Sequence, residues 1–390
     1  MTELPVRPLA ELRERRSAKW HSYPADVLPL TVAELDFDLA EPIREVLREA
    51  IERSDTGYAA PVPELGRALA GFAGRRWNWE LDPAGVHAMT DVGVASVELL
   101  RMLTEPGDTV VISPPVYPPF FHWVAEAGAR LREVPLRLDE GAGYRLDLGA
   151  LEQAFQAHPA VYLLCNPHNP VGRAHSADEL AALVELAARY QVRIVSDEIH
   201  APVVLPGAGY TPLLTVPGAA ELAFALLSAS KAWNLAGLKC AAVVAGAAGP
   251  QRLVDRLPPD GRWRTGHFGV LATVAAFTDG EPWLDRLLLT LDRRRSQLDG
   301  LLRTRLPMLS WYRPEATYLA WLNCGALGDG DAGHELFLNA AKVALEPGLN
   351  FGAVGSGYAR LNFGTSAELL DQGTAAMAAA VRMIPGSRNC

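Results

Sequence analysis

The feature that most constrains the fold of this chain is a repeated alternation of short apolar strands with amphipathic helices. Runs rich in Val, Ile, Leu and Ala occupy residues 109–115, 160–167, 192–198, 222–230 and 239–246. Apolar residues at helical spacing separate these runs, as in residues 118–129 and 176–190. Strands that are apolar along their whole length are buried on both faces. The alternation therefore predicts an α/β fold with a mainly parallel sheet covered by helices.

The alternation ends in a long predicted helix, residues 282–306, and shorter mixed elements follow it. A chain of 390 residues exceeds the size at which a single hydrophobic core stops growing. We therefore expect an N-terminal segment (residues 1–45) that packs with the small domain, and a large domain (46–285). A smaller α+β C-terminal domain (286–390) should follow.

Charge and composition exclude several classes of partner. The formal net charge is −9 without long acidic runs, whereas nucleic-acid-binding proteins usually carry a basic patch. The chain shows no signal-peptide core and no apolar run of the roughly 18 residues that a membrane helix needs. Its four cysteines are widely spaced and form no CxxC pair. We therefore expect a cytoplasmic protein that binds no nucleic acid, membrane or structural metal.

Polar residues follow the predicted strands where ligands bind in parallel sheets, at the carboxyl ends. Asn169, Asp197 and Lys231 all lie there. An isolated lysine usually extends its amine to water, but a buried lysine with a lowered pKa can form a Schiff base with a carbonyl. Asp197 could cap the next turn, or it could hold a proton on a pyridine nitrogen. The pair therefore has a structural and a catalytic interpretation.

Other residues point to a flat ring and a phosphate. Tyr117 is either a core tyrosine or a ring stacked on another ring. Backbone N–H groups bind phosphate where a helix begins after a strand, and three further residues could add hydroxyl and cationic contacts. The helix start comprises Gly93, Val94 and Ala95, and the further residues are Ser228, Ser230 and Lys239. A phosphate, a pyridinium, a stacked ring and a carbonyl together describe pyridoxal 5′-phosphate.

The chain also resembles a known family in motifs that run nearly from end to end. They include "RRSAKWHSYPADVLPLTVAELDF", "TGYAAP", "PPVYPPFF", "LCNPHNPVGR", "VSDEIHAPVV", "SASKAWNLAGLKCA" and "GLNFGAVGSGYARLNFG". These motifs resemble the fold-type I pyridoxal-phosphate enzymes of the class I/II aminotransferase superfamily. Within it the chain is most similar to the MalY/PatB-like cystathionine β-lyase subgroup. The resemblance implies an aspartate-aminotransferase-like large domain with a seven-stranded sheet.

The resemblance also assigns roles to the candidate residues. Lys231 would bind the cofactor and carry protons, Asp197 would pair with the pyridine nitrogen, and Tyr117 would stack on the ring. Asn169 would contact the phenolic oxygen and also the substrate, and His200 stands where many aminotransferases have a tyrosine. The phosphate would be bound by Gly93, Val94, Ala95, Ser228, Ser230 and Lys239. Tyr58 would reach the phosphate of a second subunit in a homodimer with shared active sites, and Arg360 would bind the substrate carboxylate.

The resemblance predicts a carbon–sulfur β-lyase that converts a cysteine S-conjugate or cystathionine-like substrate to a thiol, pyruvate and ammonia. An aminotransferase, including a decarboxylating or oxidatively deaminating relative, is the alternative, and a non-catalytic binder on the same fold is a third. Two departures stand out: Glu34 and Leu35 alter the subgroup's Ala-Asp-Met-Asp-Phe motif, and Asp91 precedes the phosphate segment. They favour a specialised, natural-product substrate over plain cystathionine.

Overall fold

A computed structural model describes residues 2–59 and 63–384. Cys390, the end of the predicted C-terminal domain, and Ala60 and Pro61 of the "TGYAAP" motif lie outside these ranges. In the described residues, no helix is both long and apolar enough to cross a membrane.

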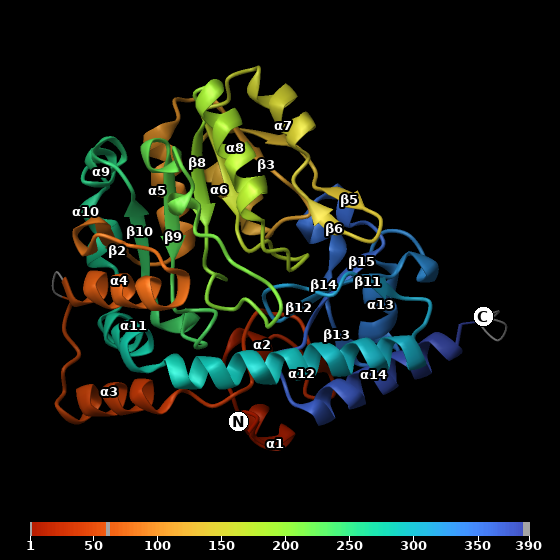
Figure 1. The fold of residues 1–390 in the computed structure, drawn as a ribbon. Helices are drawn as coiled ribbons and strands as arrows, with labels where there is room; N and C mark the ends of the chain where they lie inside the picture. Colours follow the sequence, from red (N-terminus) through yellow and green to blue (C-terminus); the bar gives the residue numbers. More distant parts are fainter. Residues whose placement is uncertain (1, 60–62, 385–390) are drawn as a thin grey trace.

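The centre of the molecule is a sheet with seven strands among the described residues (Figure 1). In spatial order the strands are β2 (Val86–Met89), β10 (Ala241–Ala245), β9 (Ala223–Leu227), β8 (Arg193–Asp197), β7 (Val161–Cys165), β3 (Thr109–Ile112) and β4 (Arg130–Glu133). Neighbouring strands from β9 to β4 are parallel, and β10 is antiparallel to both β9 and β2. The predicted mainly parallel, seven-stranded sheet is therefore confirmed, with β10 as its reversed strand.

The strands are apolar along their whole length because both faces of the sheet are covered. In β7, Val161, Leu163 and Cys165 join one hydrophobic cluster, while Tyr162 and Leu164 join another. The covering helices include α5 (Val92–Leu103), α6 (Pro119–Glu126), α7 (Leu148–Phe155), α8 (Ala177–Arg189), α9 (Ala248–Val254), α10 (Pro259–Trp263) and α11 (His267–Asp279). The start of α8 follows the expected capping chemistry, since the Ser176 hydroxyl accepts the Glu179 N–H.

A second, smaller sheet forms the C-terminal part of the molecule. Its strands, in spatial order, are β11 (Ser310–Trp311), β12 (Leu319–Asn323), β15 (Tyr358–Asn362) and β14 (Glu346–Pro347). The long helix α12 (Glu281–Arg305) runs from the large sheet to this region and lies beside α14 (Ala367–Arg382), as Figure 1 shows. The helix α13 (Ala332–Asn339) packs against β15.

The N-terminal residues connect the two parts. They form the helices α1 (Leu9–Leu12), α2 (Ala18–His21), α3 (Glu41–Glu52) and α4 (Pro63–Trp77) and the strand β1 (Leu28–Pro29). Strand β1 pairs in parallel with β13 (Val343–Ala344), whereas α3 and α4 pack against α11. A separate hairpin joins β5 (Arg137–Asp139) to β6 (Gly143–Arg145). The N-terminal residues thus pair with β13 of the C-terminal region before residue 30 and pack against α11 of the large domain after residue 40.

Candidate active site

A cavity of about 490 Å³ lies at the carboxyl ends of β7, β8 and β9. Such a volume suits a cofactor together with a small substrate. Most of the candidate residues line it, although they come from distant parts of the sequence. The lining includes Gly93, Tyr117, Asn169, Asp197, His200, Ser228, Ser230, Lys231, Lys239 and Arg360.

Three candidates do not line this cavity. Ala95 is fully buried and its N–H donates to the carbonyl of Asp91, as the first hydrogen bond of α5. The Val94 N–H donates to the Asp91 side chain at 2.8 Å. Tyr58 is 83% exposed, and its ring meets that of Trp263 edge to face at 6.2 Å. Of the predicted phosphate segment, only Gly93 therefore faces the cavity.

Lys231 places its amine on the cavity wall just beyond β9. The amine donates to the main-chain oxygen of Ala33 at 3.1 Å. Burial and the nearby Arg360 guanidinium lower the pKa of Lys231 to about 8, while Glu34 and Asp197 oppose the shift. A large fraction of the amine is therefore neutral near pH 8, as a nucleophile or a proton acceptor requires.

Asp197 ends β8 and is only 3% exposed. Its Oδ1 accepts the Ile199 N–H at 3.1 Å, yet burial raises the pKa of its carboxyl to about 7. A buried carboxylate of this kind is stabilised by a cation or a strong donor placed beside it. It is thus suited to hold a proton on a ring nitrogen.

His200 is buried against the same cavity and is kept neutral. Burial, with the positive charges of Lys231 and Arg360, lowers its pKa well below the usual value. Its Nδ1 is a buried polar atom without a hydrogen-bond partner in the described structure. A neutral imidazole with a free nitrogen can donate to or accept from a polar group of a ligand.

Arg360 projects from β15 of the smaller sheet and is 4% exposed. Its guanidinium donates to Asn169 Oδ1 at 3.0 Å and to the Thr31 carbonyl at 3.3 Å, and lies over the Phe351 ring. Glu346, which the sequence analysis did not single out, lies 4.0 Å away. The Nε atom has no hydrogen-bond partner among the described residues. These features leave Arg360 able to bind a carboxylate.

Aromatic side chains form another wall of the cavity. Tyr117 meets Trp123 edge to face at 5.9 Å, and burial raises the pKa of its hydroxyl, so the phenol stays neutral. The absence of a side chain at Gly93 permits this arrangement, because a Cβ there would lie 3.1 Å from the Trp123 indole nitrogen. Trp123 also faces the cavity and was not predicted.

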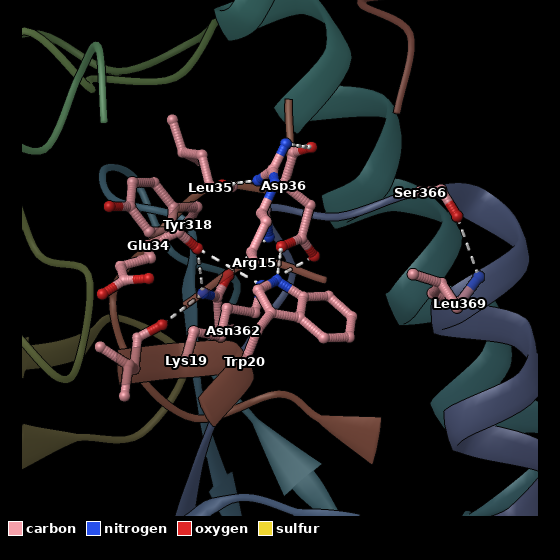
Figure 2. A network of polar contacts seen from close by, with 12 residues as sticks. Arg15, Lys19, Trp20, Glu34, Leu35, Asp36, Tyr318, Asn362, Ser366 and Leu369 are labelled. Carbon is pink, nitrogen blue, oxygen red and sulfur yellow. Dashed lines mark hydrogen bonds and ion pairs between the residues drawn. The ribbon is translucent and has the colours of Figure 1, made fainter. Parts of the chain in front are cut away.

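Sequence reasoning singled out Glu34 and Leu35 of the N-terminal strap, residues 31–36, but missed Val32 and Ala33, which the strap contributes to the cavity. Figure 2 shows how the strap is held. The buried ion pair of Lys19 with Asp36 (2.8 Å) fixes one end, and Asn362 donates to two of its carbonyls, those of Val32 and Glu34. Ala33 acts through its main chain, which any residue type could supply, so no sequence signal marks it.

The cavity fits pyridoxal phosphate on chemical grounds. An amine is available for its carbonyl, a buried carboxylate for its ring nitrogen, and aromatic side chains for its ring. The Ser230 hydroxyl and the Lys239 ammonium are available in the same cavity for its phosphate. The described residues hold no cluster of three or more His, Cys, Asp or Glu suited to a metal ion.

Comparisons with known proteins agree with this chemistry. Residues 25–377 match the family described as aminotransferase class I and II. A Mycobacterium tuberculosis protein named "Putative cystathionine beta-lyase" is 44% identical over 95% of this chain and 96% of its own length. Cystathionine beta-lyase PatB of Bacillus subtilis is 36% identical, with 91% and 93% covered.

A solved structure from Corynebacterium diphtheriae, described as a "putative plp-dependent beta-cystathionase", superposes with a TM-score of 0.91. It is 32% identical, and the match covers 97% of this chain and 99% of that one. The chain therefore belongs to the aminotransferase class I and II family, with pyridoxal phosphate as its cofactor. Within that family it falls in the carbon–sulfur lyase group that includes PatB.

Proposed function

We propose that this enzyme is a carbon–sulfur β-lyase that acts on a cysteine S-conjugate or a cystathionine-like amino acid. Substrate and one water would give a thiol, pyruvate and ammonia. The observation that carries the proposal is the meeting of Lys231, Asp197 and Arg360 in one cavity, although they come from three separate segments. Together they can bind an α-amino acid, remove its Cα proton and support the charge that develops.

Each residue has a defined task in this proposal. Arg360, held by Asn169, binds the α-carboxylate and orients the Cα–H bond. Lys231, with its lowered pKa, accepts the Cα proton. Asp197 holds a proton at the ring nitrogen. Bound pyridoxal phosphate supplies the electron sink for the pair left by the broken Cα–H bond. The sulfur then leaves Cβ with its bonding electrons.

The specialised substrate predicted from the sequence stays part of the proposal. Glu34 of the altered motif lies on the strap and raises the pKa of Lys231 through its charge, in opposition to burial. Glu346 adds a second carboxylate beside Arg360. Glu346 lines the cavity, and Glu34 directly follows the lining residue Ala33, so these acidic groups give the site its own charge pattern, which supports selection among S-linked substituents.

We propose further that the chain acts as a homodimer with shared active sites. Tyr58 and Trp263 are large aromatic side chains left 83% and 56% exposed. Trp263 lines a surface hollow of about 540 Å³ with a largely apolar wall, including Leu65 and Val270, and the Tyr58 ring packs edge to face against Trp263. An apolar face of this kind favours a second copy. Analytical ultracentrifugation of the purified chain tests this directly.

Product analysis tests the proposed reaction. The enzyme with pyridoxal phosphate should release pyruvate and thiol in equal amounts from a panel of cysteine S-conjugates, with no 2-oxo acid added. Mass spectrometry identifies the thiols. A strict requirement for an added 2-oxo acid, with a new amino acid as product, would overturn the lyase proposal in favour of an aminotransferase.

A further inference from the structure

The phosphate end of the cavity contains the carboxylate of Asp91, one of the two departures noted in the sequence. Asp91 precedes α5 as its N-cap residue, and its Oδ1 accepts the Val94 N–H at 2.8 Å. Its Oδ2 lies 2.9 Å from the Lys239 ammonium. The sequence analysis assigned both of these donors to the cofactor's phosphate. In the structure one carboxylate satisfies the two of them.

This arrangement lies inside the cavity. Asp91, Gly93 and Lys239 all line it, together with Lys231. The side chains of Lys239 and Asp91 are 54% and 33% exposed, so water weakens their ion pair and lets other anions compete. Lys239 also adopts a left-handed backbone with φ of 60°, unusual for a residue with a side chain. This conformation places the lysine opposite the start of α5.

We propose that Asp91 competes with the cofactor's phosphate for Lys239 and for the start of α5, and thereby weakens phosphate binding. A phosphate beside these donors must either displace the carboxylate or share them with it. In the second case two anions lie close together, and their repulsion lowers affinity. The helix N-terminus favours either anion, so it does not remove the competition.

The proposal is distinct from the lyase reaction, because it concerns only how tightly the phosphate is held. It predicts that the two ends of the cofactor contribute unequally to the free energy of cofactor binding. Lys231 and Asp197 would contribute more of the total, and the phosphate contacts less, than in a site without a carboxylate at this position.

The test replaces Asp91 with asparagine, which keeps the capping acceptor and removes the charge. Binding of pyridoxine 5′-phosphate and of pyridoxine to the full-length apoprotein is measured by fluorescence titration. Neither compound has an aldehyde to react with Lys231, and only the first carries a phosphate. Asp91→Asn should bind pyridoxine 5′-phosphate about tenfold more tightly and leave pyridoxine unchanged.

Asp147→Asn is the matched control. Asp147 caps α7 in the same way, since its Oδ1 accepts the Ala150 N–H at 2.9 Å, but it does not line the cavity. This variant should bind both compounds like the parent. Unchanged or weaker binding of pyridoxine 5′-phosphate by Asp91→Asn would overturn the proposal, as would equal tightening of both compounds. Because no turnover is measured, neither result bears on the lyase assignment.

Discussion

The two ends of the cofactor cavity each combine one lysine with one aspartate, in opposite environments. At the end that would hold the ring, with both its carbonyl and its nitrogen (called the carbonyl end below), Asp197 is buried and Lys231 donates to a main-chain oxygen. At the phosphate end, Lys239 and Asp91 form a direct ion pair at 2.9 Å and are partly exposed to water. Burial raises the pKa of Asp197 to about 7 and lowers that of Lys231 to about 8.

The difference shows how one pair of residue types serves two purposes. Burial makes both charged forms costly, so Lys231 and Asp197 are ready to exchange or share protons with a ligand. Lys239 and Asp91 instead pair directly in a partly exposed position, where an incoming anion would compete with Asp91 for the Lys239 ammonium. The carbonyl end should therefore control the reaction rate, and the phosphate end should control cofactor affinity.

The largest expected effect comes from comparing the two lysines. Lys231→Ala should lower kcat by about 10⁴-fold, because the residue that moves the Cα proton is lost. Lys239→Ala should weaken cofactor affinity by about tenfold and change kcat little at saturating pyridoxal phosphate. Steady-state kinetics of pyruvate release, measured at several cofactor concentrations, separate the two effects.

Thermal unfolding of the same variants provides the control. Neither substitution should lower Tm by more than a few degrees, since neither side chain packs in the core. A large loss of kcat in Lys239→Ala with saturating cofactor would remove the distinction between the two ends, because the phosphate end would then take part in the reaction.

The second comparison concerns Asp197 and the pH dependence of stability. Between about pH 4 and 7 the folded apoprotein retains a proton on Asp197 that the unfolded chain has lost. Stability therefore falls as pH rises through this window. Asp197→Asn lacks this loss, so at pH 8 it should be more stable than the parent by roughly 1–2 kcal/mol. Near pH 4 the two proteins should have similar stability.

Differential scanning calorimetry of the apoproteins at pH 4.5 and pH 8 measures this difference. Asp91→Asn is the comparison variant from the phosphate end. Asp91 is partly exposed to water, so its replacement should change Tm at pH 8 only slightly. If Asp197→Asn were less stable than the parent at both pH values, the buried carboxyl would be a structural hydrogen-bonding group. It would then not be a group whose ionisation costs folding stability.

The sequence predicted the sheet because its strands are apolar on both faces, a pattern that few other folds require. The sequence also predicted that Asp197 and Lys231 lie at the same edge of the sheet, because residues that follow parallel strands meet at the edge formed by the carboxyl ends. The antiparallel direction of β10 could not be predicted from the sequence pattern, because an antiparallel strand buried on both faces is as apolar as a parallel one. The assigned roles of these residues stay proposals.

Contacts made by the main chain or set by one helical turn were harder to predict. Ala33 reaches Lys231 through its carbonyl, which carries no residue-type signal. Ala95 follows Gly93 by only two residues, yet its N–H turns into α5 and bonds to Asp91. Tyr58 lies on the surface, where a second subunit would have to complete its predicted contact.

The smallest expected effect separates two serines at the phosphate end. The Ser228 Oγ lies 2.7 Å from the Cys240 carbonyl and 2.8 Å from the Ser230 Oγ. A hydroxyl has one hydrogen, so when Ser228 donates it to Cys240, it accepts from Ser230. Ser228 is 2% exposed and already satisfied by the protein, whereas Ser230 is partly exposed and can turn toward an anion.

Ser230→Ala should therefore weaken binding of pyridoxine 5′-phosphate by about fivefold, equivalent to about 1 kcal/mol for one hydrogen bond, and leave Tm unchanged. Ser228→Ala should instead lower the free energy of unfolding by about 1 kcal/mol, because the buried Cys240 carbonyl loses its donor. Fluorescence titration and urea unfolding measure the two quantities. Equal losses of affinity and stability in both variants would show that the serines act as one unit. Phosphate binding and folding stability would then depend on the same hydrogen bonds. The phosphate end would not be the loosely paired, exposed counterpart of the carbonyl end that the two lysine–aspartate pairs indicate.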